Sequence, residues 1–221
     1  GEIYIFKNNT DSLGNTYGCH ENFLMRRDVD FWKVTEQLIP FFVTRQIYSG
    51  AGKVLKVSGK PQYFISQRAQ HIHEKTSSST TSSRSIINTR DEPHSDAERY
   101  RRLHIIVGDS NMSEFVTYLK VGTATLVLSM IEEGYAVQGM EFEDPVKAIR
   151  EVSRDPTLKR KMKLDDGRQM TAVEVQRVYL DRAQTYLAQQ EHDPILDDIW
   201  QRWAMVLDKL EEDPMQLVRE I

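Results

Sequence analysis

Strand-like and helix-like segments follow one another in this sequence without regular alternation. Runs of β-branched, aromatic or alternating residues predict strands at 2–6, 18–25, 63–66, 85–89 and 101–107. Apolar residues at helical spacing predict helices over 28–49 (kinked or divided at Pro40), 111–133, 171–189 and 195–211. A parallel sheet needs a helical crossover between successive strands, and this order does not supply one. The sequence therefore favours an α+β fold: a mostly antiparallel sheet with helices packed on one face, followed by a helical C-terminal stretch.

The segment 111–133 has the strongest helical pattern. Asn111 is a suitable N-cap, and Glu114 stands three residues later as in a capping box. Gly134 supplies the C-terminal stop. Apolar residues at helical spacing form one stripe: Phe115, Leu119, Leu126 and Met130. We therefore expect a long helix that buries this stripe.

Charge and composition exclude several classes of protein. The chain has 221 residues, with 29 Lys and Arg against 33 Asp and Glu, and a net charge of −4. This balance argues against a nucleic-acid partner, which would favour a basic excess. No stretch of about 18 uninterrupted apolar residues is present, so we expect no membrane span. The single cysteine, Cys19, rules out an internal disulfide and suits a reducing cytoplasm.

The two ends predict an internal piece of a longer protein. The strand at 2–6 begins at once and needs a neighbour, and the pattern at 214–221 resembles the start of a helix. The run of eight Ser and Thr residues at 76–83 leaves two interpretations open. It is a flexible surface loop, or a loop that becomes ordered around a substrate.

One candidate for chemistry is the strand that contains Cys19, His20, Glu21 and Asn22. Alternation along a strand places His20 and Asn22 on one face and Cys19 and Glu21 on the other. An imidazole offers a nitrogen ligand, and a carboxylate offers the hard oxygen that Mg²⁺ prefers. The alternative is a strand with one solvated face.

Two further segments place cations at strand ends. Arg90 follows the strand 85–89 and is suited to a bidentate contact with phosphate, although it can equally pair with a neighbouring carboxylate on the surface. Arg102 and His104 share one face of the strand 101–107, which indicates that this face lines a polar cavity. The following turn at 108–111 opens the long helix, whose N-terminus can bind an anion. The alternative is that Asp109, Ser110 and Asn111 are ordinary cap formers.

Seven segments together carry a resemblance to a known family. They are 7–12 (KNNTDS), 17–22 (YGCHEN), 43–46 (VTRQ), 50–54 (GAGKV), 66–69 (SQRA), 87–94 (INTRDEPH) and 101–112 (RRLHIIVGDSNM). In this order they resemble the Pup ligase family (proteasome accessory factor A), whose fold is related to glutamine synthetase. The resemblance implies that 1–139 is part of a glutamine-synthetase-like catalytic domain, and that 140–221 is its helical continuation. It also implies that the family's first strands, with the catalytic base and most metal ligands, and its C-terminal domain lie outside this chain.

The resemblance implies an ATP- and Mg²⁺-dependent, cytoplasmic ligase. Such an enzyme phosphorylates the γ-carboxylate of the C-terminal Glu of Pup, a small disordered protein, and passes the acyl group to a lysine of a target protein. The modified target is then degraded by a bacterial proteasome. The resemblance implies neither a nucleic-acid nor a membrane partner. We expect the 221 residues alone to be inactive, because the base would lie upstream.

Site residues follow from the resemblance only where a motif matches. His20 corresponds to a histidine beside the metal and the phosphates, which makes it a metal and cofactor residue. His104 stands where relatives place an acidic metal ligand, so its role as a ligand is a departure from the pattern. Arg90 and Arg102 are expected to clamp phosphate and act in catalysis, and Arg68 is a further cofactor-binding candidate.

Two other functions remain open. The Pup deamidase and depupylase family shares the fold and most of these motifs, although Thr10, Ser12 and Cys19 agree better with the ligases. A catalytically dead relative that only binds Pup would also carry this sequence. An intact catalytic strand outside this chain would distinguish an enzyme from such a scaffold.

Overall fold

A four-stranded sheet forms one side of the protein. The structure is a computed structural model, and it describes all residues except 1, 5, 80–82 and 218–221. The strands of the sheet are β1 (Glu21–Arg26), β4 (Glu74–Ser77), β5 (Ser85–Asn88) and β6 (Tyr100–Ile105). Their spatial order is β1-β6-β5-β4, with β6 antiparallel to both β1 and β5 and only β4 parallel to β5. The prediction of a mostly antiparallel sheet is confirmed.

The strand expected at 2–6 is absent from the described residues of that segment. Residues 2–4 and 6 belong to no strand, and the side chains of Ile3, Tyr4 and Phe6 are exposed. Residues 1 and 5 lie outside the described part, as do 80–82 of the Ser/Thr run and 218–221 of the expected last helix. The β-branched and aromatic pattern at 2–6 therefore did not predict the structure of this segment, because a strand forms only beside a partner strand.

Two small hairpins and two short 3₁₀ helices complete the irregular parts. One hairpin pairs β2 (Lys53–Val57) with β3 (Lys60–Phe64), and the other pairs β7 (Met162–Lys163) with β8 (Gln169–Met170). The 3₁₀ helices are η1 (Ala69–His71) and η2 (Pro214–Leu217).

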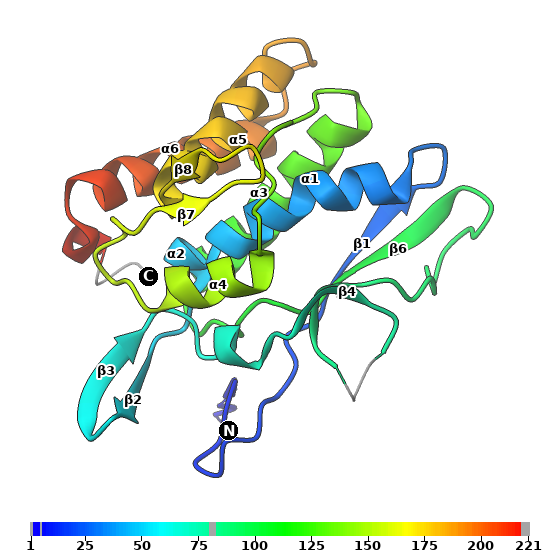
Figure 1. The fold of residues 1–221 in the computed structure, drawn as a ribbon. Helices are drawn as coiled ribbons and strands as arrows, with labels where there is room; N and C mark the ends of the chain where they lie inside the picture. Colours follow the sequence, from blue (N-terminus) through cyan, green and yellow to red (C-terminus); the bar gives the residue numbers. More distant parts are fainter. Residues whose placement is uncertain (1, 5, 80–82, 218–221) are drawn as a thin grey trace.

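The helices gather on one side of the four-stranded sheet (Figure 1). They are α1 (Phe31–Thr44), α2 (Gln46–Ser49), α3 (Glu114–Glu132), α4 (Pro145–Ser153), α5 (Ala172–Leu187) and α6 (Pro194–Glu212). The segment 28–49 does form two helices, but the prediction that Pro40 divides it is wrong, because α1 continues through Pro40 and the break comes at Arg45. The helices α4, α5 and α6 confirm the expected helical C-terminal stretch.

An aromatic cluster joins the C-terminal helices to the rest of the core. The Phe41 ring on α1 lies 5.5 Å from that of Tyr179 on α5 and 5.9 Å from that of Trp203 on α6. All three side chains are buried. Such offset and edge-on contacts stabilise aromatic pairs beyond their buried area.

The division of the chain at 139/140 stays a prediction.

The central helix α3 bears on the expectation that the chain has no membrane span. By length and composition this helix of 19 residues is sufficient to cross a membrane, with 61% of its most apolar window buried inside the protein. It contacts α1, α5 and α6, so its apolar composition fits a helix of the core. The stripe predicted from the sequence is largely buried there, with Leu119, Leu126 and Met130 inaccessible to solvent.

The N-cap of α3 is Ser113 and not Asn111, so that prediction is wrong. The Ser113 hydroxyl accepts from the backbone N–H of Val116, whereas the Asn111 side chain is buried and donates to the Ser49 carbonyl. A buried tertiary hydrogen bond therefore replaces the local cap that the sequence suggested. We expect Ser113→Ala to lower the free energy of unfolding by about 1 kcal/mol. Urea unfolding measures this loss, and an unchanged midpoint would contradict it.

Candidate active site

The sheet has one face toward the helices and one without them. Along β1, Glu21 and Met25 are buried against the helices, while Asn22 and Leu24 are exposed on the opposite face. The antiparallel register places His104 of β6 beside Asn22 on one side and beside Asn88 of β5 on the other. The face without helices therefore carries a row of polar side chains across three strands. We call it the open face because no helix covers it, although His104 and Asn88 on it are themselves buried.

The open face brings His20 and His104 together. The Nδ1 atom of His20 lies 2.6 Å from the Nε2 atom of His104, and the ring centroids are 4.8 Å apart. Gly18 permits this arrangement, because a Cβ atom at that position would lie 2.2 Å from the Nε2 atom of His20. The Nδ1 atom of His104 is buried and has no hydrogen-bond partner among the described residues. The sequence predicted both histidines, and the structure places them in one pair.

Both imidazoles are neutral near pH 7. Burial, helped by the charges of Arg102 and Arg90 and by His20, lowers the pKa of His104 to about 4. Burial also lowers the pKa of His20, with Arg68 and Arg102 acting in the same direction. A neutral imidazole offers one nitrogen as a donor and the other as an acceptor or metal ligand.

The lowered pKa of His104 predicts a loss of stability in acid. The unfolded chain takes up a proton on this imidazole below its ordinary pKa of about 6.5, whereas the folded chain resists protonation until about pH 4. The free energy of unfolding should therefore fall as the pH is lowered from about 7 to about 5, and His104→Gln should reduce this fall. Urea unfolding at the two pH values measures it, with the exposed His192→Gln as control. Equal losses in all three proteins would contradict the assignment.

Arg102 and Arg90 border the same face. The Nε atom of Arg102 donates to the Oδ1 atom of Asn22 at 2.6 Å, which fixes the guanidinium along the sheet. Glu92 joins the two cations, since its carboxylate lies 2.7 Å from Arg90 and 3.7 Å from Arg102. A shallow cavity of about 320 Å³ is lined by Arg102, Glu92 and His94, among others, but not by Arg90. The structure therefore brings the two predicted phosphate clamps together at one edge of the open face.

Arg68 occupies a different environment. It is buried, and its Nη1 atom donates to the carbonyl oxygens of Ile106 and Gly108, while Nε lies 3.3 Å from the hydroxyl of Thr16. The guanidinium therefore holds the backbone that follows β6. Arg68 is near enough to lower the pKa of His20, and its contact with a cofactor stays a prediction.

Arg45 and Glu21 form a buried ion pair on the side of β1 that faces the helices. No pattern in the sequence indicated this pair. The guanidinium of Arg45 contacts both carboxylate oxygens of Glu21, at 2.7 and 2.8 Å, with both side chains almost inaccessible. It also donates to the backbone oxygen of Lys120 on α3. Gly108 lies against this pair, because a Cβ atom there would meet the Oε1 atom of Glu21 at 2.7 Å. The pair therefore fastens the start of β1 to the helices.

Asp109 was expected to be an ordinary cap former and is instead a buried junction. Its carboxylate accepts from the backbone N–H groups of Ala51 and Gln67 and from the hydroxyl of Ser66. Burial raises the pKa of Asp109, and these hydrogen bonds oppose that rise. Its backbone oxygen accepts from the buried Nζ atom of Lys120, which also lies 3.5 Å from the Sγ atom of Cys19. In the sequence, only the presence of Lys120 in the mostly apolar helix α3 indicated that this lysine has a buried polar partner.

The two histidines alone do not make a magnesium site. Among the described residues, no group of three His, Cys, Asp or Glu side chains is arranged to hold a metal ion. Mg²⁺ prefers six oxygen ligands, and the pair offers only ring nitrogens, of which one from each ring faces the other ring. The assignment of His20 and His104 as metal ligands therefore stays a prediction.

Comparison with known proteins identifies the family. A family model described as Pup-ligase protein matches residues 1–221. The chain belongs to the Pup ligase family. A Pup–protein ligase of Nocardia farcinica is 56% identical over 96% of this chain and 47% of its own length, and one of Gordonia bronchialis is 53% identical over 99% of this chain and 48% of its own length.

Solved structures agree with this family. The Pup ligase PafA in complex with ADP is similar with a TM-score of 0.87 and 40% identity, over 100% of this chain and 50% of that chain. The complex between PafA and Pup is similar with a TM-score of 0.86 and 40% identity, over 98% of this chain and 45% of that chain. The chain thus spans about half the length of these relatives. The expected fold of the Pup ligase family is confirmed.

Proposed function

We propose that this chain supplies part of the active site of a Pup–protein ligase. The enzyme would use ATP to join the γ-carboxylate of the C-terminal Glu of Pup to a lysine of a target protein. The observation that carries the proposal is the open face, where the paired His20 and His104 lie beside Arg90 and Arg102. Relatives of this chain are Pup–protein ligases, and a related PafA was solved with ADP.

The charges of the open face suit phosphoryl transfer. The γ-carboxylate attacks the γ-phosphorus of ATP to give an acyl phosphate and ADP, and the lysine amine then attacks the acyl carbon and releases phosphate. Negative charge gathers on the phosphoryl oxygens in the first step, and fixed cations lower the energy of that state. Arg102 is held in place by Asn22, so its charge can stabilise the phosphoryl oxygens without first changing conformation. Arg90 lies at the same edge, because Glu92 pairs with both arginines.

Neutral histidines complement these cations. Because His20 and His104 carry no charge near pH 7, they do not repel a bound cation, and each keeps a ring nitrogen beyond their mutual contact. Magnesium, which we propose as the companion of ATP, would neutralise phosphate charge when bound. Oxygens from the nucleotide or from the rest of the protein would have to complete its coordination.

A ligation assay with the full-length protein tests the proposal. The reaction contains Mg-ATP, Pup ending in Glu and a lysine-bearing target, and a parallel reaction contains Pup ending in Gln. A covalent Pup–target band that requires ATP is expected. Conversion of Gln to Glu without such a band would instead identify a deamidase, and binding of Pup without either reaction would identify a scaffold. The 221 residues assayed alone should show no turnover, and measurable turnover would refute the expected upstream base.

The cellular setting follows from the same proposal. We place the enzyme in the cytoplasm, where its single Cys19 stays reduced and where its products meet a bacterial proteasome. Fractionation of cells with an antibody to the full-length protein tests this placement. Recovery of the protein outside the cytoplasmic fraction would overturn it.

A further inference from the structure

The only cysteine of this chain lies beside a buried lysine. The Nζ atom of Lys120 on α3 lies 3.5 Å from the Sγ atom of Cys19, in the segment that leads into β1. Lys120 has an exposed fraction of 4%, whereas Cys19 is half-buried. Two nucleophilic side chains that are 101 residues apart in the sequence are thus in contact.

Hydrogen bonds hold the amine of Lys120 against the sulfur. The Nζ atom donates to the backbone oxygen of Asp109 at 2.7 Å, and the backbone oxygen of Lys120 accepts from the guanidinium of Arg45. Both ends of the lysine are therefore fixed. A lysine has a flexible stem of four carbons, so this double attachment is what keeps its amine beside the sulfur of Cys19.

The ammonium group of Lys120 has no counter-charge. In the part of the chain that the structure describes, no carboxylate forms an ion pair with it. The carboxylate of Glu21 contacts Arg45 instead. That of Asp109 accepts from backbone N–H groups and a serine hydroxyl. A buried charge without a partner is unfavourable, and a bond from this nitrogen to sulfur would remove the charge.

The thiol of Cys19 has no second cysteine of this chain with which to form a disulfide. A sulfenic acid, the first product of thiol oxidation, condenses either with another thiol or with a nitrogen. The structure supplies a nitrogen, the Nζ atom of Lys120. Because Cys19 is only half-buried, a small oxidant such as hydrogen peroxide can reach its sulfur.

We propose that hydrogen peroxide joins Cys19 to Lys120 through a sulfenamide bond. The thiol is first oxidised to a sulfenic acid, and one molecule of peroxide supplies the oxygen and is reduced to water. The lysine amine, having given one proton to solvent, then attacks the sulfur. The S–N bond forms as the S–O bond breaks, and the hydroxyl leaves as a second water with one hydrogen of the amine.

The cross-link ties the segment before β1 to α3, one residue away from His20. A thiol reductant cleaves the S–N bond and restores both side chains, so the cross-link lasts only while the oxidant is present. It is a property of this pair of side chains and does not depend on the proposed ligation.

Peptide mapping by mass spectrometry tests the cross-link in the full-length protein treated with hydrogen peroxide. The wild-type protein should give a joined pair of peptides that contain Cys19 and Lys120. This pair should weigh about 2 Da less than the two peptides together, since two hydrogens are lost when the sulfenamide forms. Dithiothreitol should regenerate the separate peptides. Protein unfolded in urea before the treatment should give no joined pair, because only the fold brings the two side chains together.

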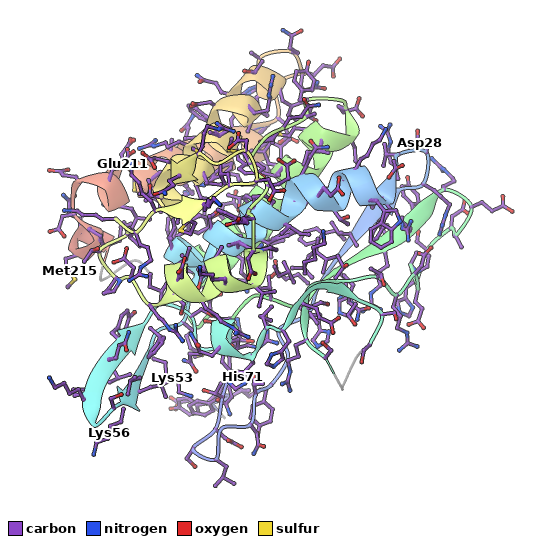
Figure 2. All side chains as sticks on the ribbon, viewed as in Figure 1. Asp28, Lys53, Lys56, His71, Glu211 and Met215 are labelled. Carbon is purple, nitrogen blue, oxygen red and sulfur yellow. The ribbon has the colours of Figure 1, made fainter. Side chains whose placement is uncertain are left out.

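Variants separate the lysine from the cysteine. Cys19→Ser should give no joined pair. Lys120→Arg keeps a donor for the backbone oxygen of Asp109 but removes the amine, so Cys19 should proceed to sulfinic acid instead. Lys56→Arg is the matched control and should give the same joined pair as the wild type. Figure 2 shows Lys56 at the end of the hairpin formed by β2 and β3, and its side chain is exposed.

Three results would overturn the proposal. The first is wild-type Cys19 that reaches sulfinic acid without any joined pair. The second is a pair that joins Cys19 to a lysine other than Lys120. The third is the same set of oxidation products from Lys120→Arg as from the wild type. None of these measurements involves Pup or ATP, so a failure of ligation with an intact cross-link would overturn only the proposed function.

Discussion

Replacing Arg45 with methionine should lower the free energy of unfolding by about 3–5 kcal/mol, the usual cost of removing one partner from a buried ion pair. The substitution leaves the Glu21 carboxylate buried, with both oxygens deprived of the guanidinium that now contacts them. It also frees the backbone oxygen of Lys120 from its hydrogen bond. Urea unfolding at neutral pH measures the loss.

A double-mutant cycle and a surface control sharpen this prediction. Adding Glu21→Leu to Arg45→Met removes the uncompensated charge and should recover part of the loss. Arg202→Met, which breaks the exposed pair with Asp198, should cost at most about 1 kcal/mol. If Arg45→Met cost no more than the surface variant, the pair would not be the fastening that we describe.

Arg102→Gln in the full-length protein should lower kcat/KM for ligation about 100-fold or more, the range found when one preorganised donor to a developing charge is removed. Glutamine keeps a polar side chain of moderate length but removes the positive charge beside the phosphoryl group. Its fold should survive, because Arg102 lies on the open face and not in the core. Steady-state ligation at varied ATP measures the effect and divides it between kcat and KM.

The matched control for Arg102 is Arg99, an exposed cation just before the same strand whose guanidinium lies over the ring of Tyr100. Arg99→Gln should leave ligation within about twofold of the wild-type rate, since exposed single charges contribute little. An equal fall in both variants would indicate a general effect of net charge. Full activity of Arg102→Gln would remove this residue from the proposed mechanism.

Local patterns in the sequence determined most of the secondary structure and the faces of the strands. Helical spacing predicted α3, α5 and α6, because a buried stripe must repeat with the helical period. Strand alternation placed His20 with Asn22 and Arg102 with His104, and the pairing of β1 with β6 then brought both sets to one face. These features depend on backbone geometry between near neighbours, which a single sequence carries.

Only the tertiary structure decided which polar residues act together. The Nδ1 contact between His20 and His104, the ion pair of Glu21 with Arg45, and the Asp109 junction join segments tens of residues apart. Asp109 had the same local signature as a helix cap, and the true cap is Ser113. A buried polar group takes whichever partner the packed chain brings within reach, and that choice depends on long-range packing. The sequence by itself therefore determined the elements and their faces, whereas the fold decided which face stays open and which charges are buried in pairs.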